Sequence, residues 1–370
     1  MEKYKDMTIK KKGNVKMLRN LILFFGLIVF TFWFIFKDQD LNELVTAIKR
    51  VDIKYFIIAV LLMFCVYLAE SFNIKCILKA FGEKKCSIFR ALKYTAIGSF
   101  FSAITPAATG GQPVEVYYMS KDGVRPPHGA MTMLLQLSGF QISTLVYSIV
   151  CGILNPSILS DGVIWFYILG LAINMIALLF MLIGTFSEKV ANKLLNFTIK
   201  MLKKFKVRNA DIKCKKIKEG LDQYNVCSKF IKDNPMEFVK AVLRVFVQIG
   251  IYHSIPFFIY RAFGLTELNF FQLFSMQAIL YTTVSGIPLP GSIGVSETLF
   301  MKIFGFAFGT SILSGAMLLY RFASFYLYII IFAVVVLIVS LRTKDIESEI
   351  DKEVKEIDEV PITKKRKAYA

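Results

Sequence analysis

The stretch Ser285-Gly-Ile-Pro-Leu-Pro-Gly-Ser-Ile-Gly-Val-Ser-Glu297 interrupts an apolar run that extends from about residue 270 to residue 341. It holds two prolines and three glycines within nine residues. A helix does not continue through it, because proline lacks a backbone donor and glycine costs the most backbone entropy. Irregular backbone at membrane depth survives only where protein or water covers it. The break and the carboxylate after it therefore predict a binding site formed by discontinuous helices; the alternative is a loop outside the membrane.

The composition is that of a polytopic membrane protein. Of the 370 residues, 55% are hydrophobic, and apolar runs of about 20 residues, the length that crosses hydrocarbon, recur along the chain. The net charge of +18 lies mainly between these runs, where the positive-inside bias and an anionic membrane surface explain it. No nucleic-acid motif accompanies it, so no nucleic-acid partner is expected. The six cysteines and two histidines show no ligand spacing, so no metal, cofactor or catalytic residue is predicted.

Charge and hydropathy along the chain predict six full spans. These cover residues 18–36, 53–69, 128–154, 163–184, 238–262 and 312–341. Besides the transmembrane domain (18–341), we expect a basic N-terminus (1–17), an interfacial helix within 37–52, a cytoplasmic basic loop (185–240) and a mobile charged tail (342–370). Both termini are expected in the cytoplasm and the protein in the plasma membrane.

A second interruption, Thr105-Pro-Ala-Ala-Thr-Gly-Gly-Gln-Pro113, lies in an apolar segment with basic residues on both flanks. Because basic flanks favour the cytoplasmic side, residues 91–123 are predicted to enter the membrane and return as a re-entrant hairpin. The first interruption lies in a second such hairpin, about residues 270–305. Three predicted spans separate the two hairpins, so they enter from opposite sides. The expected fold is all-α, with about six full spans plus two re-entrant broken-helix hairpins in an inverted repeat.

The two interruptions align at a fixed offset, which pairs Pro106 with Pro288 and Glu115 with Glu297. If Gln112 and Gly294 are N-caps, each glutamate falls at the third helical position. There it can simply stabilise the helix start by accepting hydrogen bonds from free backbone N–H groups. Alternatively, the helix start and the acid together form a polar binding site at mid-membrane, where free N–H groups bind a lipid phosphate.

Arg321 lies inside the last predicted span, where an unpaired arginine costs about 3 kcal/mol on insertion scales. It should therefore face a partner or a cavity, and Glu297 is the natural partner. The pair is either a headgroup site or a structural salt bridge. The remaining charged residues of the apolar runs are placed near span ends: Glu70, Arg261 and Lys302. The polar ones are assigned to interhelical hydrogen bonds: Gln136, Gln141, Gln248 and His253.

Two motifs, Pro-Ala-Ala-Thr-Gly-Gly-Gln-Pro-Val-Glu (106–115) and Pro-Leu-Pro-Gly-Ser-Ile-Gly-Val-Ser-Glu (288–297), precede an intramembrane Arg321. With them the chain resembles, over about residues 15–345, the transmembrane flippase module of lysylphosphatidylglycerol synthases. The resemblance implies movement of an aminoacylated phospholipid between leaflets, linked to envelope charge and resistance to cationic antimicrobials. Larger members add a cytosolic aminoacyl-transferase domain, for which the segment after the last span is too short. Many relatives carry an acid–arginine pair where this chain has Gln136, which leaves the substrate open.

The function expected from the sequence is that of a lipid flippase without covalent chemistry. The alternatives are a membrane phosphatidylglycerol lysyltransferase that uses lysyl-tRNA and a structural subunit of an envelope-lipid enzyme. The expected partners are a phospholipid substrate, the anionic membrane surface and a separate lipid synthase. The predicted lipid-binding residues are Glu297, Arg321, Glu115, Pro106, Gly110, Gly111, Gln112, Pro288, Pro290, Gly291, Gly294 and Ser296.

Overall fold

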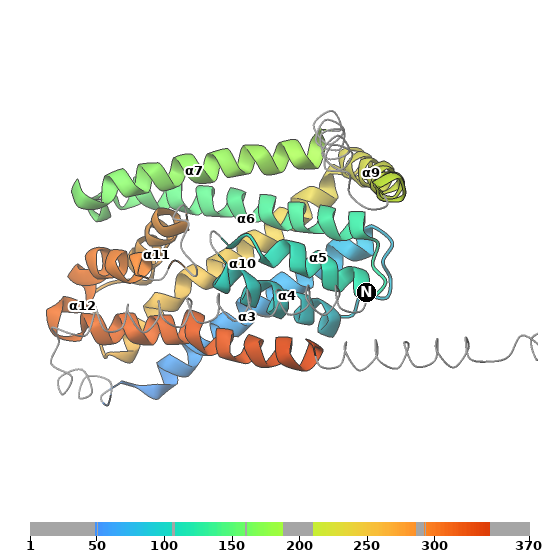
Figure 1. Cartoon of the computed structure of the whole chain (residues 1–370). Helices are drawn as coiled ribbons and strands as arrows, with labels where there is room; N and C mark the ends of the chain where they lie inside the picture. Colours follow the sequence, from blue (N-terminus) through green and yellow to red (C-terminus); the bar gives the residue numbers. More distant parts are fainter. Residues whose placement is uncertain are drawn as a thin grey trace, which may run out of the picture.

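The computed structural model describes residues 51–105, 108–159, 161–187, 210–285 and 294–340, together with Lys49 and Ser292. Within these ranges the chain forms helices and turns and no strand (Figure 1). The first predicted span, most of the predicted interfacial helix and the predicted tail lie outside the described residues.

The described residues form nine α-helices. They are α3 (Ile53–Ala80), α4 (Ile88–Ile104), α5 (Gly111–Lys121), α6 (Pro126–Leu154), α7 (Asp161–Phe186), α9 (Ala210–Asp233), α10 (Pro235–Ala262), α11 (Phe270–Ser285) and α12 (Val295–Arg321). A 3-10 turn, η2 (Pro156–Ile158), follows α6, and a π-helical turn, η4 (Phe322–Tyr326), extends α12 into a helix that continues to residue 340.

Five helical segments of the described residues are long and apolar enough to cross a membrane. They are Ile53–Ala80, Pro126–Leu154, Gly162–Phe186, Pro235–Ala262 and Val295–Ser340. Each overlaps one of the predicted spans. α3 is longer than expected and continues past the predicted end at residue 69 to Ala80. The chain is thus a polytopic membrane protein, and the part of it that the structure describes is all-helical.

Side-chain caps define where the first described helices begin. The Asp52 carboxylate accepts a hydrogen bond from the Lys54 backbone N–H at the start of α3. The Ser87 hydroxyl accepts one from the Arg90 N–H at the start of α4. Such caps satisfy N–H groups that have no partner within the helix. The turn between these helices passes through Gly82, whose φ of +87° favours glycine.

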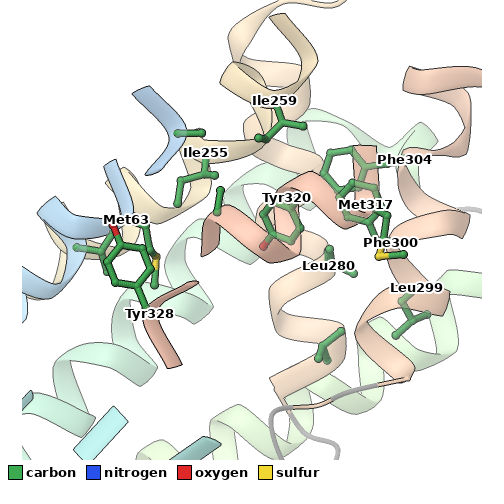
Figure 2. Packing of buried hydrophobic residues seen from close by; sticks show 14 of the residues in the cluster. Met63, Ile255, Ile259, Leu280, Leu299, Phe300, Phe304, Met317, Tyr320 and Tyr328 are labelled. Carbon is green, nitrogen blue, oxygen red and sulfur yellow. The ribbon is translucent and has the colours of Figure 1, made fainter. Parts of the chain in front are cut away.

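The bundle is built around α3 and α10, which pack along much of their lengths. In Figure 1, α10 (yellow) runs diagonally through the bundle beside α3 (blue), while α6 and α7 (greens) lie together along one side. The main apolar cluster joins residues from α3, α4, α10, α11 and α12. Figure 2 shows Met63 of α3, Ile255 of α10, Leu280 of α11 and Phe300 of α12 within it.

Large apolar side chains also cover the outer surface of the bundle. On α7, Trp165 and Phe180 are 74% and 68% exposed. A water-soluble monomer rarely exposes such contiguous apolar surface. This surface therefore suits contact with lipid chains.

Both predicted interruptions are breaks between short helices. The first break separates α4 from α5, and the second separates α11 from α12. α12 itself is divided at Gly309, whose φ of +67° and ψ of 165° are not helical and favour glycine. Each break thus lies between two short helical pieces. The direction from which either pair enters the membrane, and the inverted repeat built on it, stay predictions.

Candidate functional site

Glu297 and Arg321 form a buried ion pair at the second break. The Arg321 Nε lies 2.7 Å from the Glu297 Oε1, and the two side chains are 9% and 1% exposed. A straight α-helix would hold these two positions about 36 Å apart. The contact therefore depends on the change of chain direction at Gly309, which brings the end of α12 back to its beginning. The predicted pairing is confirmed.

The Glu297 carboxylate also accepts hydrogen bonds from groups at the start of α12. Its Oε2 accepts hydrogen bonds from the Gly294 backbone N–H at 2.6 Å and from the Ser296 hydroxyl at 2.9 Å. The Tyr326 hydroxyl lies 3.3 Å from Oε1 and donates to it. Gly294 is the N-cap and Glu297 the third helical residue, as predicted. The Arg321 guanidinium lies over the rings of Tyr326 and Phe325, at 5.4 and 4.4 Å from their centroids.

The start of α5 differs from the prediction. The N-cap is Gly110, so the expectation that Gln112 caps this helix is wrong. The Gly110 N–H donates to the Thr105 hydroxyl at 2.9 Å, which closes the turn earlier in the sequence. Pro113 becomes the third helical residue, a position where its missing N–H costs no helical hydrogen bond. Glu115 is then the fifth residue, beyond the free N–H groups of the first turn.

Glu115 is buried against α4 instead. Its side chain is 5% exposed, and its Oε1 occupies the space beside Gly98, only 1.6 Å from where a Cβ there would lie. Its Oε2 is buried and has no hydrogen-bond partner among the described residues. The charge that acts on it is that of Glu70 on α3.

The placement of Glu70 near a span end stays a prediction, whereas its contact with α10 was not predicted. Because α3 continues to Ala80, Glu70 lies well inside the helix, where its Oε2 accepts a hydrogen bond from the Gln248 amide of α10 at 3.3 Å. Sequence reasoning overlooked it as a site residue. Its signal was an isolated acid inside an apolar helix, with the polar Asn73 one turn later.

Of the other predicted site residues, some are described at the first break and the rest lie outside the described residues. At the first break, Gly111 lets α5 approach α4, since a Cβ there would lie 2.0 Å from the Ser102 hydroxyl and 2.7 Å from the Gly98 carbonyl. Gln112 is partly exposed beside it. The remaining positions, Pro106, Pro288, Pro290 and Gly291, lie outside the described residues.

The chain matches a known family over most of its length. Residues 21–331 match the family described as the lysylphosphatidylglycerol synthase TM region. The chain belongs to this family. A UPF0104 membrane protein of Archaeoglobus fulgidus is similar to it, with 25% identity over 323 residues that cover 85% of this chain and 96% of the relative. The resemblance predicted from the two motifs is confirmed.

In this family member, Gln136 belongs to a polar network between α3, α6 and α10. Its amide donates to the Gln248 Oε1 at 3.2 Å and its Oε1 accepts from the Asn73 amide. The Arg244 Nε donates to the Asn73 Oδ1 at 2.7 Å. Because the Gln248 amide bonds Glu70 as well, the network reaches the acid. The predicted interhelical hydrogen bonds of Gln136 and Gln248 are confirmed.

The same prediction is wrong for Gln141 and His253. In the described part of the structure, the Gln141 Oε1 and both ring nitrogens of His253 are buried without a hydrogen-bond partner. His253 is surrounded by aromatic rings instead, including those of Tyr147, Phe274 and Tyr281 at 5.4 to 5.8 Å between centroids. It acts as a packing residue.

Proposed function

We propose that this protein moves a phospholipid between the two leaflets of the plasma membrane and performs no covalent chemistry of its own. The observation that carries the proposal is the buried Glu297–Arg321 pair at a helix break. Charges inside membrane proteins are costly and typically mark substrate pathways. Broken helices are the common way in which transporters present backbone groups to a substrate. Membership of the lysylphosphatidylglycerol synthase family supports a role in lipid metabolism.

The charges of the two breaks fit a lipid that carries both a phosphate and a cation. At the second break, Arg321 and the positive end of α12 favour a phosphate, which would compete with Glu297 for the guanidinium. At the first break, Glu115 has a carboxylate oxygen without a partner in the described residues and favours a cationic group. A lysyl-phosphatidylglycerol-like lipid satisfies both demands. An anionic polyprenyl or glycerophospholipid is the second choice, and a separate synthase would supply an aminoacylated substrate.

The test is a leaflet-resolved assay in vesicles that contain the purified protein and a labelled lipid. A quencher or lipid-modifying enzyme on one side reports transfer, in the absence of tRNA and lysine. Glu115→Ala and Glu297→Ala variants that still fold should lose transfer. Glu237→Ala, which removes a surface carboxylate paired with the exposed Lys240, should keep it.

The rival functions predict different results in the same vesicles. A lysyltransferase would convert phosphatidylglycerol to a lysylated lipid when lysyl-tRNA is added, with no other enzyme present. That product would overturn the proposal. Failure to move any lipid, from a preparation that is folded, would also overturn it and would favour the structural-subunit function.

A further inference from the structure

Glu70 and Glu115 come together from two different helices through α4. Ser71 follows Glu70 in α3, and its hydroxyl donates to the Thr95 hydroxyl of α4 at 3.1 Å. One turn along α4 from Thr95, Gly98 receives the Glu115 carboxyl group of α5. The two carboxyl groups are close enough for their charges to interact.

The described residues offer this acid pair no positive partner. No Lys, Arg or His nitrogen among them lies within 4.0 Å of either carboxyl group. Three cations on the neighbouring helices have other partners, although the Arg244 Nη2 is buried without a hydrogen-bond partner among the described residues. Arg244 of α10 bonds Asn73, Lys93 of α4 pairs with Asp122, and His128 of α6 pairs with Glu83.

The other groups that face the pair are neutral hydroxyls and amides. The phenol groups that feel the charge of Glu70 are those of Tyr67 on α3 and Tyr281 on α11. Tyr252 of α10 is an electrostatic neighbour of both. The Gln248 amide supplies the hydrogen bond to Glu70. None of these groups compensates a buried negative charge. Two carboxyl groups that share a buried site without a cation do not both ionise, because each charge opposes the other and burial opposes both.

We propose that Glu70 and Glu115 form a proton-binding site, in which the pair holds one exchangeable proton that is released and regained as lipid is transported. Binding forms one O–H bond on a carboxylate oxygen and breaks one O–H bond of a hydronium ion, which leaves as water. Glu70 is less buried than Glu115, and we assign it as the member that exchanges the proton. The proposal deepens the proposed function: proton binding stands without it, and only the coupling to lipid movement rests on it.

Proton binding is tested on purified protein in detergent, without lipid substrate. Infrared difference spectra between acidic and alkaline buffer should show the C=O stretch of a protonated carboxylic acid. Glu70→Gln and Glu115→Gln should each lose this band, and Glu237→Gln, at an exposed surface pair, should retain it. Glu115→Asp keeps a carboxyl group, so the band should remain at a shifted frequency.

An unchanged band in both glutamine variants would overturn the proposal. So would the absence of the band in the wild-type protein, which would mean that the pair is ionised and available to a cationic lipid headgroup. Coupling is tested separately, by imposing a pH gradient across vesicles that transport lipid. The wild-type rate should change several-fold and the Glu70→Gln rate should not. Lipid transfer that ignores the gradient would remove the coupling and leave the proposed function intact.

Discussion

The two broken helix pairs share a backbone design and differ in how their glutamates are compensated. In each break a non-glycine residue adopts a left-handed conformation, Ala108 with φ of +53° and Ser292 with φ of +51°. Each of them lies two positions before a glycine N-cap. Such strain persists only where the surrounding structure imposes it, and it is typical of functional sites. The two helix starts share this left-handed residue but not the conformation of the N-cap, since φ is −85° at Gly110 and +90° at Gly294.

The glutamates are not equivalent relative to these starts. Glu297 is the third residue of α12 and reaches the Gly294 N–H, whereas Glu115 is the fifth residue of α5 and cannot reach a free N–H of the first turn. Glu297 also meets Arg321, whereas the neighbour of Glu115 is another acid. A shift of two residues thus separates a carboxylate that is compensated within the protein from one that needs a proton or a cation.

The largest effect is expected from breaking the compensated pair. Glu297→Gln or Arg321→Met leaves one buried charge without a partner, and each should cost about 3–5 kcal/mol of unfolding free energy. The loss would be measured as a lower melting temperature in detergent. The double variant should lose less than the sum of the two, because the interaction is counted twice in the singles. Strictly additive losses would contradict the pairing, and Glu237→Gln at the exposed surface provides the control.

Gly98→Ala should cost less, because it disturbs packing rather than charge. A Cβ at this position would overlap the Glu115 carboxyl group, and such overpacking typically costs about 1–3 kcal/mol. Combining it with Glu115→Ala should recover part of the loss. Gly162→Ala is the matched control, since no atom lies within 4 Å of a Cβ there. Equal melting temperatures for Gly98→Ala and Gly162→Ala would show that Glu115 does not occupy this space.

Glu115→Gln should have the smallest effect on stability. If Glu115 shares a proton with Glu70, the amide replaces a neutral group of the same shape, and the change should stay below about 1 kcal/mol. The melting temperature would be compared directly with that of Glu297→Gln. A loss as large as at Glu297 would mean that Glu115 is ionised and compensated by a group outside the described residues.

Cysteine labelling tests from which side of the membrane each broken helix pair enters. In a cysteine-free background, Glu267→Cys before α11 should react with an impermeant thiol reagent in intact cells. Lys121→Cys at the end of α5 should react only after the membrane is opened. Reaction of both positions from outside would contradict the opposed entry of the two pairs, and with it the inverted repeat.

The sequence predicted the compensated pair better than the uncompensated one, for physical reasons. Arg321 is a lone cation in a long apolar run, and Glu297 follows the only nearby break, so few partners were available. The start of α5 could not be predicted to the residue, because the Thr105 hydroxyl rather than a cap signal closes its turn. Glu70 was not predicted as a site residue because the lysines after it, such as Lys75, are typical of a span end, although α3 continues beyond them.

By itself, the sequence determined the apolar spans, the two breaks and the presence of a glutamate after each, because these depend on local hydrophobicity and on the backbone limits of proline and glycine. The tertiary structure decided which glutamate receives a cation. That outcome depends on contacts between residues far apart in the chain. The change of direction at Gly309 brings Arg321 to Glu297, and the packing of α3 and α5 against α4 brings Glu70 to Glu115.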